Sequence, residues 1–279
     1  MGGLIWLASY PKSGNTWMRT FLHNFLMNAE KPVSLNELTR FCISEVTSTH
    51  YRRRIQKPWE KVTLQDVMKI RSAVQADFTF ASPDSVFVKT HNYMGDWLGY
   101  PLVNLNVTAG AIYMVRNPLD VVLSARDHFA RPIDETIEIM GSSEGGVAKT
   151  DSHVPERYNT WSENVRSWTE HPSPQLLVLR YEDMLEKPTE AFGSVVRFLG
   201  LNPPPERLER AIANSSFKTL KALEKEEGFN ERPDHAESFF RKGQVGQWRE
   251  ELTEKQIRRI ISDHREQMER FGYIPEDYA

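Results

Sequence analysis

Cysteine is almost absent from this 279-residue sequence, which contains only Cys42. A single cysteine excludes an intramolecular disulfide, and it leaves no cysteine cluster that could hold a structural zinc ion. Low cysteine use of this kind is typical of proteins from a reducing compartment. We therefore expect a cytoplasmic protein.

Long apolar runs and strong net charge are missing as well. No stretch approaches the roughly 20 apolar residues that a membrane span needs, and the first residues lack the basic region and long apolar stretch of a signal peptide. The net charge is only -3, so no global basic field favours nucleic acid or an anionic membrane. We expect no membrane span and no nucleic-acid partner, and any basic site must be local.

The sequence does contain enough apolar material for one substantial core. Hydrophobic residues make up 39% of the chain and aromatic residues 11%. A chain of this length can bury such material in one α/β domain. The sequence therefore predicts a single domain over residues 1–279.

The first candidate site follows an apolar run at residues 4–8, which has the length of a buried strand. Turn-forming residues interrupt the run from Tyr10, and apolar residues at helical spacing begin at Trp17. A strand, loop and helix in this order are typical of an anion-binding site. The first N–H groups of a helix lack intrahelical partners, and the helix dipole adds positive potential there. Lys12, Ser13 and Thr16 supply further donors.

This loop does not match the Walker A pattern, because its lysine precedes its only glycine. The segment Tyr-Pro-Lys-Ser-Gly-Asn-Thr-Trp at residues 10–17 instead resembles the 5'-phosphosulfate-binding loop of the PAPS-dependent sulfotransferases, where PAPS is 3'-phosphoadenosine-5'-phosphosulfate. In that family Lys12 would stabilise the charge that develops on the leaving nucleotide, and Trp17 would stack on the adenine. The resemblance implies that the cofactor-binding residues of the loop are Lys12, Ser13, Gly14, Asn15, Thr16 and Trp17.

A second apolar strand, at residues 86–88, ends in Lys89, Thr90 and His91. Polar residues at the carboxyl end of a buried parallel strand lie where open α/β sheets bind ligands. This segment resembles the part of the sulfotransferases that carries the general base. The resemblance implies that His91 accepts the proton of an acceptor hydroxyl, a task that suits imidazole near neutral pH, and that Lys89 faces the sulfuryl oxygens.

A third strand, at residues 111–115, is followed directly by Arg116. Asn117 suits an N-cap and Pro118 the first position of a helix, so Arg116 is predicted beside a second helix N-terminus. A metal-dependent nucleotide hydrolase would place an acidic residue there to hold magnesium, whereas a guanidinium binds a phosphate directly. The segment resembles the family's 3'-phosphate motif, which implies that Arg116 and Ser124 contact that phosphate.

Further parts of the same resemblance lie in the second half of the chain. Tyr181, after a predicted strand at residues 176–179, would approach the nucleotide, and in Asn-Ser-Ser-Phe at residues 214–217 the serine and phenylalanine would contact the adenine. Arg-Lys-Gly-x-x-Gly-x-Trp at residues 241–248 would complete the 3'-phosphate site, because its glycines let N–H groups approach a phosphate closely. The residues implied by these two segments are Ser215, Phe217, Arg241, Lys242 and Gly243.

Three other segments carry structural expectations. Residues 141–146 and 228–240 are predicted loops that could close over a site, and residues 155–168 are predicted as a helix with aromatic side chains in the core. The short C-terminal dimerisation pattern of many cytosolic animal sulfotransferases is incomplete here, at Arg249, Thr253 and Glu254. A homodimer is therefore expected only through a different surface.

The resemblance implies an α/β fold in which helices flank a parallel sheet, related to the P-loop nucleotide kinases. It also implies transfer of the sulfuryl group from PAPS to a hydroxyl of a small-molecule, natural-product or glycolipid acceptor, by in-line displacement with His91 as general base and without a metal. An amine is a second, less favoured acceptor. Two alternatives stay open: a metal-dependent nucleotide or small-molecule kinase on a related fold, and a catalytically inactive nucleotide-binding adaptor. Intact Lys12, His91, Ser124 and Arg241 favour the enzyme over the adaptor.

Overall fold

The computed structural model describes residues 2–279 and divides into two compact units. Unit 1 contains the described residues up to Pro11 together with Cys42–Tyr113 and Glu138–Val178. Unit 2 contains Lys12–Phe41, Met114–Ile137 and Leu179–Ala279. Each unit is thus assembled from three separate stretches of the chain, and the single domain over residues 1–279 stays a prediction.

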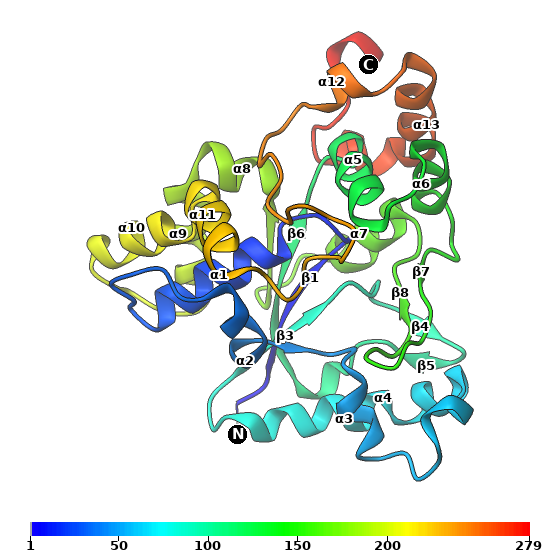
Figure 1. Cartoon of the computed structure of the whole chain (residues 1–279), viewed down its shortest axis with the longest axis vertical. Coiled ribbons are helices and arrows are strands. Elements are labelled where there is room, and N and C mark those ends of the chain that lie inside the picture. The colour runs from blue at the N-terminus through cyan, green and yellow to red at the C-terminus, as the bar shows by residue number, and fades with distance from the viewer. Residues whose placement is uncertain (1) are drawn as a thin grey trace. The chain divides into compact units, whose positions relative to one another are not determined.

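A five-stranded sheet with the order β2-β3-β1-β6-β9 organises unit 1, and its strands β3, β1 and β6 are labelled in Figure 1. The strands are β1 (Leu4–Ser9), β2 (Ile43–Ser44), β3 (Val86–Thr90), β6 (Thr108–Val115) and β9 (Leu176–Arg180), and only the last residues of β6 and β9 belong to unit 2. β3 pairs in parallel with β1 and β2, and Ala8 lies opposite Thr90. Most of β1 and β6 is buried, as expected for strands of a parallel sheet. The predicted strands and the predicted fold class are confirmed.

The remaining elements of unit 1 are helices and two-residue strands. They are α3 (Ser48–Arg52), η2 (Trp59–Lys61), α4 (Leu64–Phe78), η3 (Thr79–Ala81), β4 (Asp96–Trp97), β5 (Tyr100–Pro101), η4 (Leu105–Val107), β7 (Gly146–Val147), β8 (Glu156–Arg157) and α7 (Trp161–Thr169). A further helix, α6 (Ile133–Met140), contributes residues to both units.

A buried ion pair connects α4 to the residue that follows β2. Arg71 Nη1 lies 2.8 Å from Glu45 Oε1, and both side chains are fully buried. Glu45 also accepts hydrogen bonds from the hydroxyl of Thr90 and the side-chain amide of Asn92. A buried carboxylate is tolerated when it is paired and hydrogen-bonded in this way. The residues on both sides of His91 are therefore fixed by one carboxylate.

The helix predicted over residues 155–168 begins later than predicted. Glu156–Arg157 forms β8 and pairs with β7, and α7 starts only at Trp161. The reason is local, because the side chain of Thr160 accepts a hydrogen bond of 2.9 Å from the N–H of Glu163 and so caps the helix. The aromatic side chains of this stretch are buried, as predicted.

Replacing Thr160 by alanine should lower the free energy of unfolding by about 1 kcal/mol, because it removes the N-cap acceptor of α7. Urea denaturation followed by circular dichroism measures the loss. Thr160→Ser, which keeps a hydroxyl at the cap, is the matched control and should retain most of the stability. Equal losses in both variants would show that the methyl group, and not the cap, stabilises this position.

Unit 2 is helical. Its elements are α1 (Asn15–Leu26), η1 (Leu35–Glu37), α2 (Leu38–Phe41), α5 (Pro118–Phe129), α8 (Tyr181–Glu186), α9 (Pro188–Phe198), α10 (Pro205–Asn214), α11 (Phe217–Glu227), α12 (Trp248–Glu251), α13 (Glu254–Arg270) and η5 (Glu276–Tyr278). One group packs α1 against α10 and α10 against α9, and a second packs α5 against α12 and α13 (Figure 1).

Two predicted helix starts in unit 2 are confirmed. Asn117 caps α5 by accepting the N–H of Leu119, with Pro118 at the first helical position. Thr253 and Gln256 form a capping box at the start of α13. Across residues 2–279, no helix combines the length and the apolarity that crossing a membrane would require.

Candidate functional site

The loop between β1 and α1 adopts a backbone that depends on its residues. Gly14, the N-cap of α1, has φ +100°, and a Cβ there would lie 2.9 Å from the Tyr181 ring, so the position requires glycine. Lys12 has φ +67°, which is uncommon for a residue with a side chain and is typical of functional sites. The loop thus holds Lys12 in a strained conformation directly before a helix N-terminus.

Ser13 supplies a donor that the described residues do not use. Its side chain is fully buried, and within residues 2–279 its hydroxyl has no hydrogen-bond partner. A buried polar group without a partner costs free energy, so such groups are rare unless a ligand or water satisfies them. The Ser13 hydroxyl lies at the N-terminal end of α1, where the helix favours an anion.

Arg116 connects this loop to two other segments of unit 2. Its Nη1 donates to the Lys12 carbonyl at 3.0 Å, and its Nη2 donates to the Gln244 carbonyl at 3.4 Å. The guanidinium also stacks on the Tyr181 ring at 4.3 Å, and its Nε has no partner among residues 2–279. Arg116 therefore brings the predicted residues Lys12 and Tyr181 together with the segment at residues 241–248.

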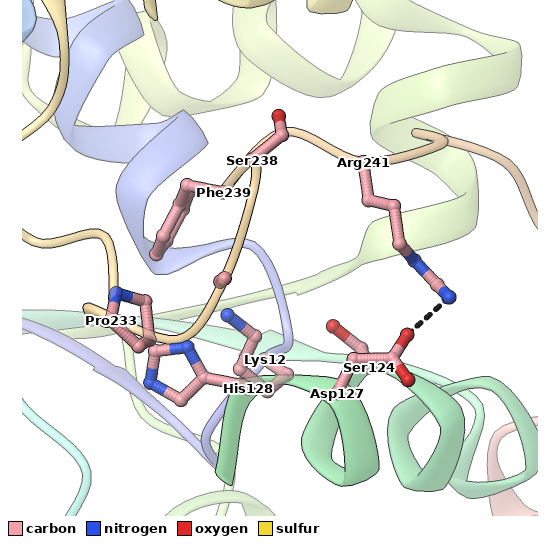
Figure 2. A pocket seen from close by; sticks show the side chains of 9 residues that line it. Lys12, Ser124, Asp127, His128, Pro233, Ser238, Phe239 and Arg241 are labelled. Atoms are coloured by element: carbon pink, nitrogen blue, oxygen red, sulfur yellow. Dashed lines mark ion pairs between the residues drawn. The ribbon is translucent and has the colours of Figure 1, made fainter. Parts of the chain in front are cut away.

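A small pocket in unit 2 contains three of the predicted site residues and their neighbours (Figure 2). Its lining comprises Lys12, Ser124, Asp127, His128, Pro233, Ala236, Ser238, Phe239 and Arg241. Figure 2 shows Arg241 reaching from its loop toward α5, where it forms an ion pair with Asp127. Lys12 Nζ lies 4.3 Å from the centroid of the Phe239 ring. Two cations and a serine hydroxyl from distant parts of the sequence thus meet at one site.

Other predicted site residues have contacts of their own. Lys242 is half-exposed, is absent from the pocket lining and forms an ion pair of 2.8 Å with Glu251. The Ser215 hydroxyl is buried and donates to the Ala211 carbonyl at 2.8 Å, at the end of its own helix. The hydroxyl of this serine is therefore engaged within α10 in this structure.

Trp17 and Phe217 share one apolar cluster. Both pack against the buried side chains of Leu35, Leu38, Leu220, Phe229 and Phe240. The Trp17 ring also meets the Tyr181 ring edge-on at 5.6 Å. Gly243 has φ +60°, and a Cβ there would lie 2.2 Å from the Phe217 ring, so this glycine lets the backbone pass directly beside the phenylalanine.

In unit 1, His91 is oriented by the backbone of β1. Its Nδ1 lies 2.9 Å from the Ser9 carbonyl oxygen and 3.2 Å from the Ser9 hydroxyl. A carbonyl oxygen can only accept, so this geometry assigns the ring proton to Nδ1 and leaves Nε2 with its lone pair. The backbone carbonyl of His91 accepts from the side-chain amide of Asn164 at 3.0 Å. The ring is thus held in the tautomer that a base acting through Nε2 needs.

Sequence reasoning missed Glu156, which contacts the same histidine. The N–H of His91 donates to its carboxylate at 3.3 Å, and the Tyr158 hydroxyl donates at 3.4 Å. Burial raises the pKa of the Glu156 carboxyl to about 7, and the positive charge of Lys89 opposes part of this shift. No motif marks Glu156, because its contact with His91 joins residues that lie 65 positions apart in the sequence.

Glu156 should make the stability of the protein depend on pH. Its folded pKa of about 7 lies above the ordinary value of 4.5. The contribution of the protonated Glu156 carboxyl to the free energy of unfolding is therefore fully present below about pH 4.5, and it is lost as the pH rises through 7. Over this range the free energy of unfolding should fall by about 3 kcal/mol more in the parental chain than in Glu156→Gln.

Urea denaturation at several pH values measures this difference. Glu156→Gln keeps an acceptor for the His91 N–H and cannot titrate, so it isolates the charge. Glu170→Gln, at an exposed acid of unit 1, is the control and should follow the parental curve. An identical pH dependence in the parental chain and Glu156→Gln would mean that Glu156 is ionised normally.

The sulfotransferase domain model matches residues 4–272 of the chain. The chain belongs to the PAPS-dependent sulfotransferase family. It is 28% identical to sulfotransferase 1E1 of Bos taurus, over 88% of this chain and 77% of that protein. It is 25% identical to flavonol 3-sulfotransferase of Flaveria bidentis, over 92% of this chain and 78% of that protein.

Solved sulfotransferase-fold structures have the same fold as this chain. Retinol dehydratase in complex with androsterone and the inactive cofactor PAP matches with a TM-score of 0.64 at 19% identity, over 95% of this chain and 80% of that chain. Mouse sulfotransferase SULT7A1 complexed with PAP matches with a TM-score of 0.61 at 21% identity, over 95% and 84%.

The predicted family, fold and enzyme class are confirmed, and this sulfotransferase transfers a sulfuryl group from PAPS to a hydroxyl acceptor. The kinase and adaptor alternatives are thereby set aside. Among residues 2–279, no group of three or more His, Cys, Asp or Glu side chains is arranged to hold a metal ion. Independence of a metal, and the role of each site residue, stay predictions.

Proposed function

We propose that this sulfotransferase moves the sulfuryl group of PAPS to the hydroxyl of a small-molecule, natural-product or glycolipid acceptor by in-line displacement, with His91 as general base. PAPS supplies the activated sulfuryl group. The observation that carries the proposal is the contact of His91 Nδ1 with the Ser9 carbonyl, which leaves Nε2 as the acceptor of a proton. Lys89, two residues before His91, would face the sulfuryl oxygens.

The β1–α1 loop would bind the 5' end of the nucleotide. Lys12 would stabilise the charge that develops on the bridging oxygen as the bond to sulfur breaks. The unpartnered Ser13 hydroxyl and the N–H groups at the start of α1 would donate to the same oxygens, with Gly14, Asn15 and Thr16 shaping the loop. The buried hydroxyl supports this role, because a phosphate oxygen would give it a hydrogen-bond partner.

The 3'-phosphate would lie against Arg116, Ser124 and Arg241. Ser124 and Arg241 line one pocket, and the Arg116 Nε has no partner among residues 2–279. A guanidinium suits a phosphate because its donors form a planar fork. Arg241 is paired with Asp127 in this structure, so the phosphate would take the place of that carboxylate. Lys242 and Gly243 are proposed to complete the site from the same segment.

The adenine would lie between aromatic side chains of unit 2. Trp17 and Phe217 belong to one cluster, and Trp17 contacts Tyr181. Flat aromatic faces of this kind stack well on a purine. Ser215 is proposed as a polar contact, which would require its hydroxyl to leave the Ala211 carbonyl.

The remaining properties are proposed on general grounds. No metal is needed, because a sulfuryl group carries less negative charge than a phosphoryl group and lysines can stabilise it. A cytoplasmic location follows from the single cysteine, and one domain follows from the length. A homodimer, if formed, would use a surface other than the incomplete pattern around Thr253.

Calorimetry tests the donor half of the proposal. The chain should bind 3'-phosphoadenosine 5'-phosphate, called PAP below, more tightly than ATP with magnesium. The opposite preference would contradict it. Incubation with labelled PAPS and a panel of phenols, glycosides and alcohols then tests the acceptor half, because transfer of label to a hydroxyl identifies the acceptor class. Transfer only to amines would contradict the hydroxyl assignment.

A further inference from the structure

Helix α5 presents three polar side chains on one face. Asp120, Ser124 and Asp127 are spaced four and three residues apart, which places them on the same side of a helix. Ser124 and Asp127 line the pocket, and Asp127 pairs with Arg241 (Figure 2). Asp120, one turn earlier, therefore lies on the face of α5 that meets residues 241–248.

Both carboxylate oxygens of Asp120 accept hydrogen bonds from that segment. Its Oδ2 accepts the backbone N–H of Gly246 at 2.7 Å, and its Oδ1 accepts that of Trp248 at 3.3 Å. The Asp120 side chain is buried, with a relative exposure of 3%. Hydrogen bonds to a buried carboxylate are stronger than neutral ones and fix geometry as well as distance. Two N–H groups of one short segment are thus held by one side chain.

The path of the segment is set by its glycines and by contacts with other elements. Gly243 and Gly246 both have positive φ, so the chain bends twice within residues 241–248. Arg116 donates to the Gln244 carbonyl, between the two glycines. Asp120, in the first turn of α5, and Arg116, two residues before α5 begins, therefore both hold the segment, while Arg241 at its beginning reaches the pocket.

Stabilisation of α5 itself does not explain the contacts that the Asp120 carboxylate makes. An acidic residue in the first turn of a helix is favourable to the helix dipole wherever its side chain points. The Asp120 carboxylate, however, accepts N–H groups from residues 246 and 248 and not from the first turn of α5. The N-cap of α5 is already supplied by Asn117. The contacts of Asp120 thus serve the segment and not the helix.

We propose that Asp120 is a positioning residue, which holds the N–H groups of Gly246 and Trp248 and so sets the path of residues 241–248 for binding a 3'-phosphate. The inference rests on the proposed function, because it assigns the 3'-phosphate to this segment. Asp120 does not touch the nucleotide in this account. It determines how strongly the site prefers a nucleotide that carries a 3'-phosphate over one that lacks it.

The test compares two nucleotides that differ only in this phosphate. Calorimetry of the full chain with PAP and with adenosine 5'-phosphate gives the preference as a ratio of affinities. Asp120→Asn keeps one acceptor oxygen and replaces the other with an amide that cannot accept. Its affinity for PAP should fall by at least about tenfold, while its affinity for adenosine 5'-phosphate should stay within about twofold, so the ratio falls.

Two further variants make the result decisive. Asp134→Asn, at an exposed aspartate of α6 in the same unit, is the control for the change of charge and should keep the parental ratio. Gly246→Ala changes the other partner of the hydrogen bond to Asp120. Gly246 has φ +80°, which strains an alanine, and only a flexible arginine side chain lies within 4 Å of the new Cβ. It should lower the ratio even if Asp120→Asn does not fold.

The possible outcomes distinguish a failure of the positioning role from a failure of the proposed function. An unchanged ratio in Asp120→Asn, or equal losses for both nucleotides, would overturn the positioning role and leave the sulfotransferase site intact. A parental chain that binds both nucleotides equally would overturn the assignment of the 3'-phosphate to this segment, and the inference with it. A lower ratio in Asp120→Asn with the parental ratio in Asp134→Asn supports the proposal.

Discussion

Replacing Lys12 by alanine should lower the turnover of sulfuryl transfer by at least about 100-fold. In the proposed mechanism its ammonium stabilises charge that develops only as the bond between sulfur and the leaving oxygen breaks, and loss of one such donor costs about 100-fold to 1,000-fold in other enzymes. Turnover at saturating PAPS, measured with an acceptor found in the screen, gives the effect. PAP binding should weaken far less than turnover.

The control for this prediction is Lys255→Ala, at an exposed lysine of α13 in the same unit. Lys12 also rests on the Phe239 ring, so thermal unfolding of both variants should be compared before the rates are interpreted. A folded Lys12→Ala variant with the parental rate would show that this lysine only binds phosphate, and the proposed role in bond cleavage would be wrong.

Replacing His91 by alanine should lower turnover by about 100-fold to 10,000-fold, the range expected for loss of a general base. PAP binding should survive, because His91 is not among the residues proposed to bind the two phosphates. Single-turnover rates and calorimetry with PAP together make this distinction. The residual rate of His91→Ala should no longer rise with pH, because the variant has no base at this position that could lose a proton.

His171→Ala, at an exposed histidine of unit 1, is the matched control and should keep the parental rate. The outcome that contradicts the prediction is loss of PAP binding in His91→Ala with a parental rate at saturating nucleotide. That result would make His91 a structural residue, whose contact with the Ser9 carbonyl stabilises the fold.

Local patterns explain which parts of the fold could be predicted. The strands β1, β3, β6 and β9 are apolar runs of strand length, and α5 and α13 begin at side chains that cap their own backbone. Both signals act over a few residues, so the sequence displays them directly. The helix predicted over residues 155–168 starts too early because it relies on the same kind of local pattern. Tyr158 has the spacing of a helical residue, but it is buried directly after β8.

Contacts between distant residues explain what could not be predicted. Glu156 and Asp120 are ordinary acidic residues in the sequence, and their roles arise from partners that lie far along the chain. The role of Arg241 and Lys242 at a phosphate stays a prediction, and the sequence does not reveal the partners that they have in this structure, Asp127 for Arg241 and Glu251 for Lys242. Motifs reveal the chemistry that a site needs, whereas the choice among neighbouring charges depends on packing.

The division of each unit into three stretches of chain has a consequence for folding. Lys12, near the beginning of the sequence, obtains its neighbours Arg116 and Phe239 only after most of the chain has been made. A protein whose contacts join such distant residues closes large loops and folds slowly. During synthesis the loop between β1 and α1 emerges before these partners exist, so the apolar strand β1 stays exposed until the later stretches of the chain are made.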